Sequence, residues 1–127
     1  MAPLSPNLWV ELDHVQLAMP SGAEEIARRF YVDLLGMVEV SKPAALASRG
    51  GIWLRTGKVE LHLGVETDFR PARKAHPAIM AKDLAAVARE LTQSGVRVVW
   101  DDALPERTRF YADDFFGNRL EFIQIAA

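Results

Sequence analysis

The feature that most constrains this chain is an internal repeat with a period of about 60 residues. His14 and His76 lie 62 residues apart, and Glu60 and Glu121 lie 61 apart. A unit of this length alone is too small to bury its helix face well. The repeat therefore predicts two stacked copies of one supersecondary unit rather than two independent domains.

Hydrophobic periodicity predicts the same order of elements, β-α-β-β-β, in each repeat. In the first repeat we expect strands over 9–19, 37–40, 47–54 and 58–64, with a helix between the first two that starts at a capping box, Ser21–Glu24, and ends at Gly36. In the second we expect strands over 76–81, 96–100, 107–112 and 119–125, with a helix capped by Asp83 and closed by Gly95. The polar segment 65–75 reads as a linker, and Gly50-Gly51 predicts a bulge or a close backbone approach. The fold class is thus α+β, a single domain of two βαβββ modules at about 9–64 and 76–125.

Composition and charge exclude several function classes. The chain has 127 residues, a net charge of −2 and no cysteine. The charge argues against nucleic-acid binding by phosphate neutralisation. The lack of cysteine excludes disulfides, thiolate metal sites and a cysteine nucleophile. No apolar stretch approaches the length of a membrane span, and no signal peptide is visible, so we expect a cytoplasmic protein without a membrane or nucleic-acid partner.

Strand alternation places the polar residues on one face. The apolar alternates, such as Leu61 and Phe122, face the helices, and the opposite face carries His14, Gln16, Glu60, His62, His76, Arg119 and Glu121. A single strand histidine is usually a surface or hydrogen-bonded residue. Here all three histidines of the chain share the face, and two of them open their repeats. Because unpaired imidazoles and carboxylates are costly to bury, this placement favours a divalent metal site.

Three motifs resemble the vicinal oxygen chelate superfamily, the group of glyoxalases, bleomycin-resistance proteins and extradiol dioxygenases. They are Leu12-Asp13-His14-Val15-Gln16-Leu17-Ala18, the helix ending Phe30-Tyr31-x-x-Leu34-Leu35-Gly36, and the segment Asp113–Phe122 with its Asp114-Phe115-Phe116-Gly117-Asn118 turn. The resemblance covers the chain from about Leu12 to Ile125. It implies a cupped, partly open mixed sheet around a divalent metal, with the helices on the outer face.

The resemblance also implies a ligand set. His14, His76 and Glu121 match ligand positions, and Glu60 matches the fourth ligand of glyoxalase I. His62 is an alternative fourth ligand, because it lies two residues after Glu60 and faces the same way. Its counterpart in the second repeat is Ile123, so symmetry favours Glu60. Fosfomycin-resistance enzymes and extradiol dioxygenases use two histidines and one glutamate.

The expected function is a metal-dependent lyase or isomerase acting on two neighbouring oxygens of a small substrate. One divalent ion per site (Ni, Co, Mn, Fe or Zn) would act as a Lewis acid. Glu60 or Glu121 would move a proton, His62 is a further proton carrier, and Arg119 and Gln16 are candidate substrate contacts. The alternatives are a metal-free, ligand-sequestering protein of the bleomycin-resistance type and an Fe(II) extradiol-type dioxygenase.

The expected assembly is a homodimer, because a sheet built from two modules leaves open edges. The resemblance adds that modules often pair across subunits. One site would then draw His14 and Glu60 from one chain and His76 and Glu121 from the other. The linker is long enough to permit either this arrangement or a site within one chain.

Overall fold

The computed structural model describes residues 2–126 and contains two four-stranded sheets, one from each repeat. The first sheet has the order β1-β4-β3-β2, formed by Val15–Met19, Val59–Val65, Ile52–Thr56 and Glu39–Val40. The second has the order β5-β8-β7-β6, formed by Ala78–Ala81, Arg119–Gln124, Arg109–Asp113 and Val99–Trp100. In each sheet the first and last strands of the repeat pair in parallel and the others are antiparallel. The predicted α+β class with two equivalent modules is therefore confirmed.

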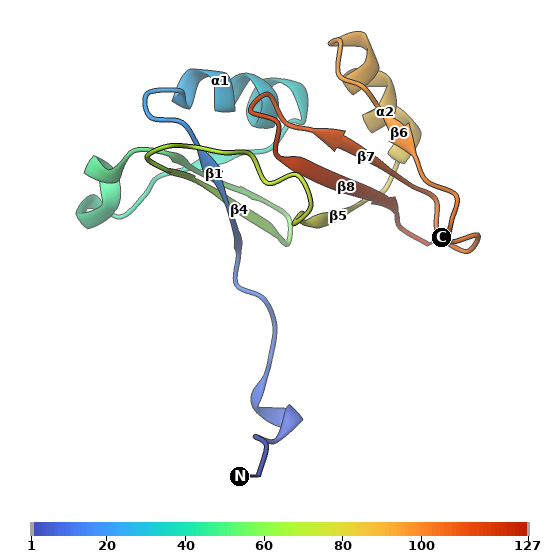
Figure 1. The fold of residues 1–127 in the computed structure, drawn as a ribbon, viewed down its shortest axis with the longest axis horizontal. Coiled ribbons are helices and arrows are strands. Elements are labelled where there is room, and N and C mark those ends of the chain that lie inside the picture. Colours follow the sequence, from blue (N-terminus) through green and yellow to red (C-terminus); the bar gives the residue numbers. More distant parts are fainter. Residues whose placement is uncertain (1, 127) are drawn as a thin grey trace.

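The two helical segments lie on the same side of the sheets, as Figure 1 shows. In the second repeat α2 runs over Leu84–Gln93, and Asp83 caps it by accepting a hydrogen bond from the Ala86 amide, as expected. In the first repeat α1 covers only Glu24–Arg28 and continues as a π-helical segment, η2, over Arg29–Leu34.

The predicted capping box at Ser21 is wrong. The residue before α1 is Ala23, and no side chain caps it. Glu24, which the capping box would turn back on the helix start, instead accepts a hydrogen bond of 2.8 Å from the amide of Gly51. This contact gives a hydrogen-bond acceptor to the Gly51 amide, in the loop that leads into β3. A tertiary hydrogen bond thus replaces the local one that the capping box would make.

Two predicted strands are too long. Strand β1 begins at Val15, where its pairing with β4 starts opposite Leu61. Residues 9–14 have no strand partner among the described residues. The segment Ala44–Arg49 forms a 3₁₀ helix, η3, where the strand over 47–54 was expected to begin. Its alanines favour helical backbone, and the strand starts only after Gly51. The remaining strands differ from the expected ranges by a few residues at their ends, where boundaries are hardest to place.

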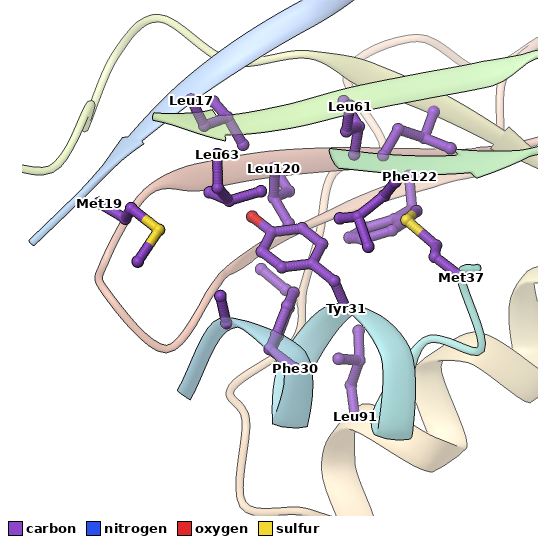
Figure 2. Close-up of a cluster of buried hydrophobic side chains, with 14 of the residues drawn as sticks. Leu17, Met19, Phe30, Tyr31, Met37, Leu61, Leu63, Leu91, Leu120 and Phe122 are labelled. Atoms are coloured by element: carbon purple, nitrogen blue, oxygen red, sulfur yellow. The ribbon is translucent and has the colours of Figure 1, made fainter. Parts of the chain in front are cut away.

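The core lies between the helices and the apolar faces of both sheets. Phe30 and Tyr31 of η2 are fully buried, and they point toward Leu61 and Leu63 of one sheet and Phe122 of the other in Figure 2. The same cluster includes Leu91 of α2. Since one continuous core serves both repeats, neither repeat buries its apolar face without the other.

A polar network joins the repeats at the β7–β8 turn. The buried Asp114 carboxylate accepts hydrogen bonds from Tyr31 Oη, from the amides of Phe116 and Asn118, and from Asn118 Nδ2. Asn118 Nδ2 also donates to the carbonyl of Ala18 in β1. A turn in the second repeat therefore holds a helix and a strand of the first.

Candidate functional site

The first half of the candidate site is centred on His62 in β4. His62 is 5% exposed, and its Nε2 lies 3.0 Å from Glu60 Oε2 on the same face of the strand. Its ring stacks between Trp53, at 4.0 Å and an interplanar angle of 3°, and His14, at 4.0 Å and 21°. Trp53 is the direct strand partner of His62. These side chains line a hollow of about 420 Å³ with Arg55.

The charges in this half are paired. Glu60 Oε1 accepts a hydrogen bond of 2.6 Å from Arg55 Nε. The Arg55 guanidinium, together with His62, holds the pKa of Glu60 below its usual value. Asp13 lies 2.8 Å from His14 Nδ1, so Nε2 is the ring nitrogen of His14 that could bind a metal. A metal ion binds an ionised carboxylate and a neutral imidazole nitrogen. Glu60 offers the ionised carboxylate.

The second half is built from His76, just before β5, and Glu121 in β8. His76 Nε2 lies 3.0 Å from Glu121 Oε1, and His76 Nδ1 lies 2.8 Å from the carbonyl oxygen of Lys74. A carbonyl oxygen only accepts, so Nδ1 carries a proton. The Nε2 lone pair would then face a carboxylate unless a proton or a cation lies between the two groups. A proton or a metal cation between His76 Nε2 and Glu121 Oε1 would therefore stabilise this contact.

Arg109 is a site residue that the sequence left open between the surface and the edge of a cavity. Its Nη1 donates hydrogen bonds to Glu121 Oε2 at 3.0 Å and to Tyr111 Oη at 2.9 Å. Its Nη2 donates to Asp101, and its Nε is buried with no hydrogen-bond partner among residues 2–126. Burial raises the pKa of Glu121, but the hydrogen bonds from Arg109 and His76 outweigh this effect and lower it overall. Glu121 is thus ionised in a largely buried position.

The two predicted substrate contacts lie in different places: Gln16 lines the hollow of the first half-site, whereas Arg119 lines a separate hollow of about 520 Å³ with Tyr111. Arg119 makes no ion pair with Glu121; its guanidinium lies 3.9 Å from the ring centroid of Tyr111, a cation–π contact. The Gln16 amide lies so close to Gly64 that a Cβ there would approach Nε2 to 2.7 Å. Gln16 lines the hollow of His14 and also a second hollow, of about 640 Å³, that reaches His76.

The two halves do not form one ligand cluster within the described chain. No group of three or more His, Asp or Glu side chains among residues 2–126 is placed to hold a metal ion. Each half instead presents one histidine–carboxylate pair at 3.0 Å with an arginine on the other carboxylate oxygen. The carboxylates of the two pairs are equivalent in the repeat, but the histidines are not, because the counterpart of His76 is His14 and His62 pairs with Glu60 instead.

Comparison with known proteins gives a consistent result. No family model matches the chain, and no curated protein does. Among solved structures, the chain is 45% identical to a glyoxalase family protein from Bacillus anthracis, with a TM-score of 0.89 over 93% of this chain and 97% of that one. A glyoxalase/dioxygenase from Nostoc punctiforme is 18% identical, with a TM-score of 0.80 over 100% and 99% of the two chains. A glyoxalase family protein from Enterococcus faecalis is 19% identical, with a TM-score of 0.67 over 91% and 98%.

The last two similarities show the fold, and the first shows the family. In the part of the chain that the structure describes, no helix has the length and apolar character needed to cross a membrane. The paired βαβββ modules, the histidine–glutamate pair in each and the 45% identity lead to one conclusion. The chain belongs to the glyoxalase family of the vicinal oxygen chelate superfamily.

Proposed function

We propose that this protein is a divalent-metal-dependent enzyme that acts on a small substrate through two neighbouring oxygens, in a lyase or isomerase reaction. The observation that carries the proposal is the contact of His76 Nε2 with Glu121 at 3.0 Å, because the Lys74 carbonyl fixes the proton on Nδ1. A metal ion would supply the positive species between these groups. Two imidazole nitrogens and two carboxylates suit Ni, Co, Mn, Fe or Zn.

The ligands proposed are His14, Glu60, His76 and Glu121, with His62 as the alternative to Glu60. Since no single chain gathers three of them among its described residues, we propose that a homodimer completes each site. His14 and Glu60 would come from one chain and His76 and Glu121 from the other. Pairing by a two-fold axis would create two equivalent sites.

The bound metal would act as a Lewis acid on the substrate oxygens. The chain itself supplies groups that move and hold protons. Glu60 is kept ionised by Arg55, and Glu121 by Arg109, so either carboxylate can take a proton from a carbon next to a carbonyl. His62, stacked on Trp53, is held rigidly and can carry that proton onward.

Metal analysis of the purified protein tests this proposal. We expect about one divalent ion per site, and metal at a hundred times its Kd should add roughly 2.7 kcal/mol to stability, which raises the Tm by roughly 10 °C. A panel of vicinal oxygen substrates then identifies the reaction. Protein that neither retains nor takes up a divalent ion, and whose melting is unchanged by a chelator, would contradict it.

A second candidate is a metal-free protein that sequesters a ligand, and one observation favours it. Each site carboxylate already has a guanidinium as an ion-pair partner, so a metal is not the sole positive group available to it. The Trp53–His62–His14 stack could then receive a flat ligand. Tight binding of a substrate-panel compound without turnover and without metal would support this candidate.

A further inference from the structure

The N-terminal arm, residues 3–13, is apolar yet lies outside the body of the protein. Figure 1 shows it running away from the sheets on the side opposite the helices. The arm contains five large apolar side chains that are 59–90% exposed: Leu4, Leu8, Trp9, Val10 and Leu12. Scattered exposed apolar residues are ordinary, but five along one short segment mark an interaction surface.

The internal repeat makes this arm unusual. The equivalent segment before β5 folds back on its own module, where the amides of Arg119 and Glu121 donate to the carbonyls of Ala72 and Pro77. In the arm, the backbone hydrogen bonds stay inside the short 3₁₀ helix at Pro6–Leu8 and its cap. Residues 10–13 make no backbone hydrogen bond to any other described residue.

The charges indicate what the arm binds. Its only charged residues are Glu11 and Asp13, both exposed. The linker of the same chain exposes two acidic residues at its start, Glu66 and Asp68, and its second half, residues 70–75, exposes Arg70, Arg73 and Lys74. None of these three basic side chains forms an ion pair among residues 2–126. A second copy of this chain therefore offers a basic surface that matches the acidic positions of the arm.

The area involved is sufficient for a stable dimer. In a two-fold pair, two arms would remove on the order of 1,000 Å² of apolar surface from water, and the surfaces they cover would add a comparable amount, which reaches the range of specific interfaces. We infer that the N-terminal arm of one chain docks on a second copy, with Glu11 and Asp13 toward the basic second half of the linker of that copy. Asp13 also contacts His14, so docking would fix the arm end of the first half-site.

This inference rests on the proposed dimer, and sedimentation of two variants tests it separately. Val10→Asp places a charge on the arm, and Val38→Asp is the matched control, because Val38 is 57% exposed and lies outside the arm. We expect Val10→Asp to weaken dimerisation at least about tenfold, which is 1.4 kcal/mol, and Val38→Asp to change it little. Since Val10 is 90% exposed, its replacement leaves the core untouched.

The unaltered chain provides a second test. A zero-length carbodiimide reagent joins carboxylates to amines, so ¹⁴N and ¹⁵N chains are mixed, treated and digested. We expect cross-links from Glu11 or Asp13 to Lys74 in peptides of mixed isotope. Cross-links only within one chain, or a dimer that Val10→Asp leaves intact, would overturn the arm inference and leave the shared site standing. A chain that is monomeric at every concentration would overturn both the arm inference and the proposed dimer. The proposed metal-dependent function would still be tested by metal uptake.

Discussion

Tyr31 donates a hydrogen bond of 2.6 Å to Asp114, although the two residues are 83 positions apart in the sequence. The contact joins η2 of the first repeat to the β7–β8 turn of the second. Burial raises the pKa of the Tyr31 hydroxyl, and the neighbouring Asp114 raises it further, so the hydroxyl remains a donor at neutral pH. It is one of four donors that satisfy the buried Asp114 carboxylate.

Tyr31→Phe should therefore destabilise the protein by about 1–3 kcal/mol, because it leaves a buried carboxylate short of one donor without changing the ring packing. Denaturant unfolding measures the change, and the slope with denaturant should stay that of the wild type. An unchanged midpoint would show that the contact contributes nothing to joining the repeats.

Gly51→Ala should be far more damaging than Gly22→Ala. Both glycines have a positive φ, +83° and +76°, so both substitutions incur backbone strain. Only at Gly51 would a Cβ meet another atom, the carbonyl oxygen of Leu63 at 2.0 Å, whereas Gly22 has open space. We expect a loss of about 1 kcal/mol for Gly22→Ala and at least twice that for Gly51→Ala, measured by thermal or denaturant unfolding. Equal losses would mean that the close approach of β3 to β4 is absent.

Glu24→Gln should reduce stability in a pH-dependent way. The hydrogen bond from the Gly51 amide lowers the pKa of Glu24 below 4.5 in the folded state. A lowered carboxylate pKa stabilises the fold above the unfolded value, and this stabilisation is lost as the pH falls through the folded value. The variant should thus be less stable than the wild type at pH 7, and the two should converge below pH 4.5.

Glu25→Gln is the matched control, because Glu25 lies in the same turn and its side chain is 79% exposed. Its effect should be small at pH 7. If Glu24→Gln and Glu25→Gln give the same pH profile, the Glu24–Gly51 contact does not explain the loop conformation.

Glu60→Gln and His62→Ala should separate the two candidates for the fourth ligand. If Glu60 is the ligand, Glu60→Gln weakens metal binding and His62→Ala mainly lowers activity. Calorimetric titration of metal into each variant measures the difference. The reverse outcome would assign the position to His62 and end the argument from symmetry.

The fold was largely predictable because the repeat and the strand alternation are both visible in the order of the residues. The Asp83 cap follows from neighbouring residues, and it is confirmed. The failures occur where distant contacts decide. Ser21 does not cap α1 because Glu24 binds Gly51 instead, and residues 9–14 find no strand partner although their alternation suits a strand.

The position of some candidate side chains on the strands was predictable in the same way. Alternation placed Glu60 and His62 on one face, and the structure brings them to 3.0 Å. Arg109 could not be assigned to the site from the sequence because its strand partner is Ile123, and it reaches Glu121 diagonally across β7 and β8. The contact between Arg109 Nη1 and Glu121 Oε2 depends on the direction of the arginine side chain, which the order of the residues does not give. The ligand roles, the metal, the dimer and the cytoplasmic location stay predictions.

Metal binding after subunit exchange tests the central claim, a site shared between two chains, most directly. His14→Ala and His76→Ala are prepared separately, mixed under conditions that exchange subunits, and analysed for bound divalent ion. If sites are shared, each variant alone binds little metal. The mixture should then recover up to about one quarter of the wild-type sites, because half of randomly paired dimers are mixed and each holds one intact site. A mixture that binds no more metal than the separate variants, while the wild type binds one ion per site, would contradict the shared site.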